Sequence, residues 1–367
     1  MIAFGIMTIS FDSEHSYIND IANLAEPCGM ECFRFTPANI NPLTLQVEGK
    51  KFMPQTKSWV DKDFPIPALI YDRCFYGDDD HSKQCIPIVS WLKNRPEITF
   101  LGYGLPNKLE LYEVLKSTVL SAYLPLSHAV SNTGIVLNEL TAKKRMILKP
   151  INGSQGNGIY YLKKNNKSFH VKTEKNKNII SRIFPNETKL NSWLQPLISK
   201  RPYLMQPYLE LSNDDLQPFD IRILLQKGID GKWGEMGRGI RVGSTGGILS
   251  NLSAGGFITI YDDWSSSLQP AKKDYINQEL AYILSNLPPI LENAFLPLFE
   301  IGIDIGIAKN GSIWILDINS KPGRKVLLHT QPDIKETLTL APLLYGKHLS
   351  QMAQNERKSY YEKTLSH

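Results

Sequence analysis

The chain has 367 residues, of which 42% are hydrophobic and 21% charged, and its formal net charge is +5. A chain of this length and composition can bury a large core, and we expect two or three globular domains. The small basic excess is dispersed and accompanies no aromatic platform or binding motif, which argues against a nucleic-acid-binding protein. No apolar run is long enough to span a membrane.

The cysteines and the first residues bear on the cellular compartment. Cys28, Cys32, Cys74 and Cys85 show no C-x-x-C spacing, which argues against a zinc site and favours free thiols in a reducing compartment. The apolar run at residues 2–9 has no basic leader, so we interpret it as a first strand and not as a signal peptide. We therefore expect a cytoplasmic protein.

The first hundred residues alternate between strand and helix patterns. This alternation predicts an open α/β sheet, without the G-x-G-x-x-G pattern of a dinucleotide site. We interpret the acidic run at residues 78–81 as an exposed loop and not as a metal site. The predicted strands are 2–9, 31–37, 67–75 and 97–105, and the predicted helices are 16–30 and 86–96.

A lysine on an apolar strand precedes a flexible loop in the middle of the chain. Residues 107–123 have apolar residues at helical spacing, and residues 146–162 then read MILKPINGSQGNGIYYL. A strand that aims Lys149, followed by a loop that offers backbone N–H groups, suits a phosphate. A hairpin turn with an edge lysine is the alternative. We interpret the basic stretch at 163–178 as a solvated hairpin.

The second half of the chain is rich in predicted strands. A helix is predicted at 187–199 and another at 278–295, and the polar tail at 351–367 is interpreted as a surface helix. The predicted strands are 202–211, 220–228, 232–243, 255–262, 299–308 and 312–320.

Three oxygen-bearing side chains stand on the last two predicted strands, which an Asn-Gly turn joins. Asp317 and Asn319 are two residues apart, so they point to the same face of a sheet, and the turn can bring Asp304 opposite them. Such an all-oxygen set suits Mg²⁺ or Mn²⁺ and leaves room for phosphate oxygens. The alternative is an ordinary hairpin with polar residues near its turn.

Six segments resemble the ATP-grasp superfamily in their order: MILKP, GSQGNG, YLMQPYLEL, DIRIL, NLSAGG and LDINSKPG. Within it, FDIRILLQ through NLSAGG and WILDINSKPGR look most similar to the YheC/YheD group, described as endospore-coat-associated. They are also similar to the ribosomal-protein glutamate ligases and the lysine-biosynthesis ligases. The resemblance covers roughly residues 100–345. The first hundred residues resemble the N-terminal domain of the same group, but less specifically.

The resemblance implies an α/β protein whose ATP-grasp part is α+β, with the nucleotide between two antiparallel sheets. It implies an N-terminal open α/β domain at 1–104. The first ATP-grasp part, with a helical linker and a glycine-loop lid, would be 105–209. The C-terminal subdomain with the metal site would be 210–350, before a polar tail at 351–367.

The resemblance also assigns ATP and Mg²⁺ (or Mn²⁺) as cofactors. Lys108 and Lys149 would hold the phosphates, and Asp304, Asp317 and Asn319 the metal. One of Asn213, Asp214 and Asp215 would contact the ribose, and Tyr203 and Tyr208 equally suit plain strand packing. The loop over the triphosphate would be Gly153, Ser154, Gln155, Gly156, Asn157 and Gly158, and the adenine hinge would be Gln206, Pro207, Tyr208 and Leu209.

Three arginines are candidates for the catalytic contacts. Arg222, Arg238 and Arg241 would line one cleft, where their guanidinium forks suit a carboxylate or an acylphosphate. Asn251, with Gly255 and Gly256, would close the same wall. The alternative is surface arginines on exposed strand faces. The family's metal-bridging residue is normally glutamate in an E-x-N pattern, but here it is Asp317, so a single-metal site and slower chemistry are both open alternatives.

These assignments imply an ATP-dependent carboxylate–amine ligase that works through an acylphosphate. Its substrates would be a small-molecule or peptide carboxylate and an amine, and spore-coat association is implied by the resemblance. The alternatives are a phosphotransferase on the same scaffold and a non-catalytic, nucleotide-binding or assembly module. The sequence identifies neither the acid, nor the amine, nor the oligomeric state.

Overall fold

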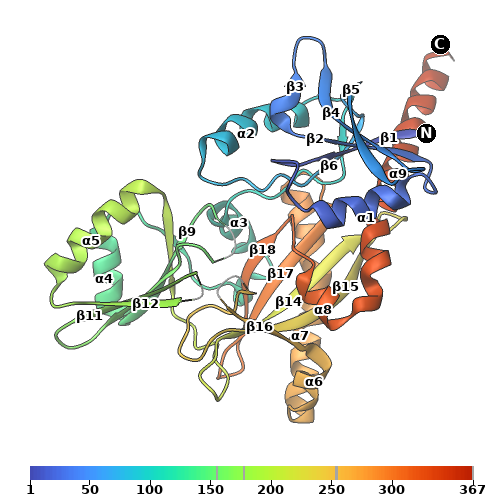
Figure 1. Cartoon of the computed structure of the whole chain (residues 1–367). Helices are drawn as coiled ribbons and strands as arrows, with labels where there is room; N and C mark the ends of the chain where they lie inside the picture. Colours follow the sequence, from blue (N-terminus) through green and yellow to red (C-terminus); the bar gives the residue numbers. More distant parts are fainter. Residues whose placement is uncertain (154–155, 177, 253–254, 366–367) are drawn as a thin grey trace.

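The computed structural model describes residues 1–153, 156–176, 178–252 and 255–365. These residues form a mixed α/β structure in which three sheets lie around a common centre (Figure 1). The sequence predicted the strand and helix alternation of the first part and the strand-rich second half, and both are confirmed. The predicted domain boundaries stay predictions.

The first sheet has the strand order β3-β4-β2-β1-β6-β7, and β5 extends it by pairing with β4. β1 runs parallel to β2 and β6, as an open α/β sheet requires. The β4–β5 hairpin was not predicted, because its exposed face is rich in charged residues. The strands are β1 (Ile2–Met7), β2 (Met30–Phe35), β3 (Ile40–Asn41), β4 (Gln46–Met53), β5 (Ser58–Pro65), β6 (Leu69–Asp72) and β7 (Thr99–Phe100), and the helices are α1 (His15–Ala25) and α2 (Asp80–Lys93).

The acidic run at 78–81 is the start of a helix, and the loop prediction was wrong there. The Asp79 carboxylate accepts a hydrogen bond from the Ser82 backbone N–H at 2.8 Å, which makes it the N-cap of α2. Aspartate is favoured at this position because it satisfies a backbone donor that has no partner inside the helix.

The second sheet is antiparallel, with the order β12-β11-β10-β9-β13-β8, and α4 and α5 pack on one face of it. α3 is shorter than predicted and ends at Leu115, whose carbonyl accepts a hydrogen bond from the Thr118 hydroxyl. The elements are α3 (Lys108–Leu115), β8 (His128–Ala129), α4 (Thr133–Lys143), β9 (Arg145–Pro150), β10 (Tyr160–Lys164), β11 (Phe169–Lys175), β12 (Asn178–Phe184), α5 (Glu187–Lys200) and β13 (Tyr203–Pro207).

The third sheet is also antiparallel, with the order β16-β15-β14-β17-β18. α7 packs on one face against Ile221, Ile223 and Leu225, and α8 packs on the other face against Leu224. The elements are β14 (Phe219–Lys227), β15 (Trp233–Val242), β16 (Phe257–Ile260), α6 (Tyr261–Ser266), α7 (Pro270–Ala294), β17 (Glu300–Ile307), β18 (Ile313–Asn319), α8 (Lys325–Thr330) and α9 (Lys335–Leu365).

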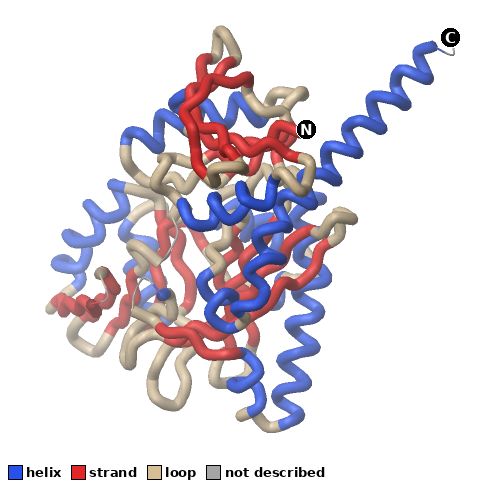
Figure 2. Tube along the Cα trace, turned by 45° about the vertical axis from the view of Figure 1, so that its right-hand side comes forward, coloured by secondary structure: helices blue, strands red, loops and turns tan. Residues whose placement is uncertain are grey.

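The last helix, α9, connects the end of the chain to the first sheet. Leu343 and Tyr345 of α9 share a buried cluster with Phe4 and with Phe299, which precedes β17. The later part of α9 extends away from the body of the molecule in both views (Figures 1 and 2). None of the described helices combines the length and the apolar character needed to cross a bilayer.

Candidate functional site

A cavity of about 970 Å³ lies between the second and third sheets. Its walls come from the two predicted halves of a nucleotide site, and Ser13, Glu14 and Phe75 add residues from the first part of the chain. The predicted site residues that line it are Lys108, Lys149, Gly153, Gly156, Asn157, Gln206, Pro207, Tyr208, Leu209, Arg222, Arg241, Asn251, Asp304, Asp317 and Asn319.

The strand register of the third sheet places opposite charges in one row. Arg222 of β14 is the direct partner of Asp304 on β17, and Asp304 is the partner of Asp317 on β18. An irregularity in the β17–β18 pairing follows Asp304, and Gly302 faces Asn319. The prediction that the hairpin brings Asp304 opposite Asp317 is therefore confirmed. The metal-binding role of these residues stays a prediction.

Two arginines hold the buried carboxylate of Asp304. Arg222 Nε lies 2.9 Å from Asp304 Oδ1, and Arg241 Nη2 lies 2.8 Å from Oδ2. Arg241 also forms a two-pronged pair with Asp220, with both distances at 2.7 Å. Burial alone would raise the pKa of Asp304, but the two guanidinium groups outweigh it and lower the pKa below its usual value.

Two lysines stand beside Asp317. Lys108 Nζ is in direct contact with Asp317 Oδ1, and Asn319 Nδ2 lies 3.3 Å from Oδ2. Lys149 of β9 reaches the same cavity, and among the described residues no carboxylate lies within ion-pairing distance of its Nζ. Burial, opposed by the attraction of Asp317 and Asp304 and assisted by the nearby Lys108 ammonium, lowers the pKa of Lys149 from its usual 10.5 to about 8.

The residues present fit a nucleotide with its metal ion. No described group of three His, Cys, Asp or Glu side chains could hold a metal alone. Asp317 and Asn319 nevertheless offer oxygen ligands beside a site for phosphates, and Mg²⁺ is often held by one or two carboxylates together with substrate phosphates. Arg222 Nη1 is buried and has no hydrogen-bond partner among the described residues, so it is a free donor for an anionic group.

The glycines of the predicted triphosphate loop are required by close packing. Gly156 has φ +77°, and a Cβ there would lie 2.6 Å from Asn251 Nδ2. Gly158 has φ +76° and leaves room for the Arg201 guanidinium, although Gly158 itself is not among the residues that line the cavity. The predicted Ser154 and Gln155 lie outside the described residues.

The residues of the predicted adenine hinge line the cavity, and the side chain of one of them, Gln206, hydrogen-bonds to a residue outside the hinge. Gln206 Nε2 donates to Ser127 Oγ at 2.7 Å, and Tyr208 packs against Tyr161 with the rings at 62°. Tyr203 is fully buried in the core under α4 and α5, so plain packing is its role. Asn213 bonds to Gln217. Neither Asn213 nor Asp214 and Asp215 are among the residues that line the cavity, although Ser212 is.

The placement of Arg238 in the same cleft was wrong. Arg238 pairs with Glu235 at 2.5 and 2.6 Å and lies over the Tyr261 ring, in a separate pocket of about 430 Å³. The reason is strand alternation, because Arg238 and Arg241 are three residues apart on β15 and point to opposite faces. Gly255 and Gly256, expected beside Asn251, likewise lie outside the cavity lining.

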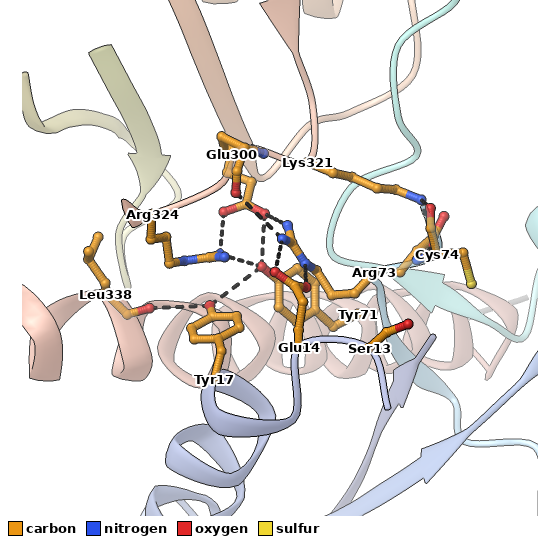
Figure 3. A network of polar contacts seen from close by, with 12 residues as sticks. Ser13, Glu14, Tyr17, Tyr71, Arg73, Cys74, Glu300, Lys321, Arg324 and Leu338 are labelled. Carbon is orange, nitrogen blue, oxygen red and sulfur yellow. Dashed lines mark hydrogen bonds and ion pairs between the residues drawn. The ribbon is translucent and has the colours of Figure 1, made fainter. Parts of the chain in front are cut away.

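A buried polar network that the sequence did not reveal joins the first sheet to the site (Figure 3). The Arg73 side chain is 0% exposed and pairs with Glu14 and with Glu300, each at 2.6 Å. Arg324 donates to Glu300 and to the Tyr71 hydroxyl, both at 2.7 Å. Glu300 begins β17, and Arg324 follows β18, so the network fixes both strands of the Asp304–Asp317 hairpin. A glutamate inside the apolar run FEIGI was its sequence signal.

A second missed residue, Glu174, connects the two walls of the cavity. It lies in the stretch predicted to be a solvated hairpin, but it is buried, and its Oε1 accepts the backbone N–H groups of Ile248 and Leu249 at 2.5 and 2.9 Å. Lys172, two residues earlier, lines the cavity. The hairpin is confirmed, but the prediction that its residues are solvated was wrong for this face.

Comparison with solved structures identifies the fold. D-alanyl-alanine synthetase A from Vibrio cholerae O1 biovar eltor str. N16961 matches with a TM-score of 0.55 and 11% identity, over 94% of this chain and 98% of that chain. The D-alanine-D-alanine ligase from Coxiella burnetii matches with a TM-score of 0.53 and 11% identity, over 99% of each chain. Together with the sheets described above, this defines an ATP-grasp fold.

Sequence comparison then gives the family. The family model described as YheC/D like ATP-grasp matches residues 97–349, and the chain belongs to this family. The endospore coat-associated protein YheC of Bacillus subtilis (strain 168) is 37% identical over 350 residues, which cover 95% of this chain and 96% of the relative. YheD of the same organism is 25% identical, over 94% of this chain and 76% of the relative.

Proposed function

We propose that this protein is an ATP-dependent carboxylate–amine ligase. The observation that carries the proposal is the charged row Arg222–Asp304–Asp317, with Lys108 and Lys149 beside it, inside a cavity between two antiparallel sheets. Positive groups there would neutralise phosphates, and two oxygen-bearing side chains stand where a phosphate-bound cation would lie. The solved structures with the same fold include a ligase and a synthetase that make D-alanyl-alanine by name, which supports the reaction class.

The proposed chemistry has two steps. A substrate carboxylate oxygen attacks the γ-phosphorus of ATP, the bond from that phosphorus to the β-phosphate oxygen breaks, and an acylphosphate and ADP form. An amine nitrogen then attacks the acyl carbon, the bond to the phosphate oxygen breaks, and the nitrogen loses a proton. The products are an amide, ADP and phosphate.

The side chains would act by positioning and by neutralising charge. Lys149 and Lys108 would hold the phosphates, and the glycine loop would cover them with backbone N–H groups. Arg222, with its free Nη1, would bind the carboxylate and then the acylphosphate. Asp317 and Asn319 would hold Mg²⁺, which when bound would neutralise phosphate charge. Asp304 would keep Arg222 and Arg241 in place.

The cellular setting belongs to the proposal as well. The relatives are named endospore coat-associated proteins, so we infer a cytoplasmic enzyme of a sporulating cell whose product reaches or modifies the spore coat. The acceptor would be a small molecule or a peptide with a free amine.

Isotope transfer tests the first step without knowledge of the amine. Candidate acids labelled with ¹⁸O in the carboxylate are incubated with the protein, MgATP and a mixture of amines. The proposal predicts ADP together with phosphate that carries one ¹⁸O atom, and loss of both products in the Lys149→Ala and Asn319→Ala variants. ADP formation that is undiminished in both variants would refute the assignment, and a phosphorylated hydroxyl product without free phosphate would identify a phosphotransferase.

One observation keeps a second function open. Asp317 is shorter than the family's glutamate and already carries the Lys108 ammonium, which would suit a nucleotide-binding module without turnover. Such a module would bind MgATP with a thermal shift but release no labelled phosphate with any acid tested.

A further inference from the structure

The cations that belong to the protein occupy most of the carboxylate oxygens at the proposed metal position. Both oxygens of Asp304 face arginines, at 2.9 Å from Arg222 and 2.8 Å from Arg241. Arg241 is shared with Asp220, whose second partner is the Ser250 hydroxyl at 2.5 Å. Asp304 is therefore paired with two arginines, although its Oδ1 accepts no hydrogen bond among the described residues, and a metal ion bound there would have to displace at least one arginine.

Within the described part of the chain, Asp317 has a single cationic partner, which contacts one of its two oxygens. Lys108, the first residue of α3, contacts Oδ1, whereas Oδ2 faces the Asn319 amide nitrogen at 3.3 Å. This orientation of the amide leaves the Asn319 oxygen available. One edge of Asp317 and one amide oxygen are enough for a single Mg²⁺ ion that takes its other ligands from phosphates and water.

The charge balance also limits the number of ions. Around the proposed metal position, Asp220, Asp304 and Asp317 are already paired with Lys108, Arg222 and Arg241, and Lys149 adds a further cation to the cavity lining. Two bridging divalent ions would have to displace Lys108 from Asp317 and at least one arginine from Asp304. Each displacement would leave a cation without its carboxylate partner, which is costly for Arg222 and Arg241 because their side chains are largely removed from water.

We propose that the site binds one divalent ion per nucleotide, and that the Lys108 ammonium takes the position on Asp317 that a second ion would need. This inference rests on the nucleotide site of the proposed function. The proposal also explains why residue 317 is aspartate. Its side chain is one methylene shorter than that of glutamate, and its carboxylate holds one lysine and one ion. The ion arrives with the nucleotide, since the site without phosphates has an excess of positive charge.

Counting bound Mn²⁺ tests the proposal without measuring activity. The full chain is saturated with the β,γ-imido analogue of ATP, Mn²⁺ is titrated, and free Mn²⁺ is followed by electron paramagnetic resonance. We expect one Mn²⁺ per bound analogue, and at least tenfold weaker Mn²⁺ binding without the analogue. Two Mn²⁺ ions per bound analogue in the wild type would overturn the proposal.

Two variants test the role of Lys108. Lys108→Met and Asp317→Glu are each expected to raise the count toward two per bound analogue, and the second variant serves if the first no longer binds the analogue. Lys172→Met removes another cation from the cavity lining without touching Asp317, and its count is expected to stay at one. A count of one in both Lys108→Met and Asp317→Glu would refute the role of Lys108. Failure of the wild type to bind the analogue at all would instead refute the nucleotide site of the proposed function.

Discussion

Lys149 provides a prediction in which affinity and stability change in opposite directions. Its pKa is lowered from the usual 10.5 to about 8, first by burial. Phosphate binding favours the charged lysine and raises this pKa. The affinity for a metal-free nucleotide is therefore highest well below pH 8, where Lys149 is charged before the nucleotide binds. It falls as the pH rises from 8 toward the pKa of Lys149 in the complex.

The size of the effect follows from the two protonation states. At pH 7 about nine-tenths of the Lys149 side chains are charged in the free protein, and at pH 9 only about one-tenth. If the complex keeps the lysine charged, the dissociation constant rises roughly tenfold between these pH values, equivalent to about 1.4 kcal/mol. The folded protein also binds fewer protons than the unfolded chain between about pH 8 and 10.5, so stability rises with pH in that window.

The assay is titration of the wild type and of Lys149→Met with ADP in EDTA from pH 7 to 9, with urea unfolding of both at pH 7. The wild type is expected to lose affinity as calculated. The variant is expected to bind ADP weakly and to lack the roughly tenfold rise in dissociation constant between pH 7 and pH 9. It is expected to be at least as stable as the wild type, because it no longer buries a charge. Parallel pH profiles for the two proteins would refute the reasoning, as would a variant that is clearly less stable.

The remaining predictions concern the residues around the site. Glu174→Ala should speed dissociation of a fluorescent ADP analogue about tenfold or more, because two hydrogen bonds to a charged acceptor join the cavity walls. Glu174→Gln, which keeps an acceptor oxygen, should recover part of the loss. Equal dissociation rates in the wild type and both variants would contradict this role. Arg73→Met should lower the free energy of unfolding, measured in urea, by about 3–5 kcal/mol, since two carboxylates lose their buried cation. Lys50→Met removes a cation that pairs with an exposed aspartate, and it should cost at most about 1 kcal/mol. Similar losses in both variants would contradict a stabilising role for the buried network. Arg238→Gln should leave the dissociation constant for MgATP within about twofold of the wild type, and a tenfold loss would place Arg238 in the site after all.

The sequence predicted those parts of the site that local geometry decides. Asp317 and Asn319 are two residues apart on a strand, so they lie on the same face of the sheet. The Asn-Gly turn predicts a hairpin, and the meeting of Asp304 with Asp317 therefore followed from spacing alone. The same rule separates Arg238 from Arg241, because an interval of three places side chains on opposite faces. The error was to place Arg238 beside Arg222 and Arg241 because all three stand on strands expected to line one cleft, without separating the two faces of β15.

Contacts between distant segments could not be predicted in this way. Arg73 and Glu300 are separated by 227 positions and meet because the end of β6 in the first sheet lies against the start of β17 in the third (Figure 3). Glu174 sits in a stretch dominated by lysine and asparagine, and only the approach of the loop around Leu249 buries it. Burial of a charged residue depends on what packs over it, and a single sequence does not state that.

The most direct test of the account is whether MgATP binds in the cavity between the two sheets. The thermal midpoint of the purified protein is measured with and without MgATP, beside Lys149→Ala and Asp317→Ala variants. A ligand present at 100 times its dissociation constant adds about 2.7 kcal/mol to the free energy of unfolding. If MgATP binds in this cavity, the midpoint rises only when Mg²⁺ is present, and the rise is lost or much reduced in both variants. No rise in a folded wild type, or an equal rise in all three proteins, would contradict it.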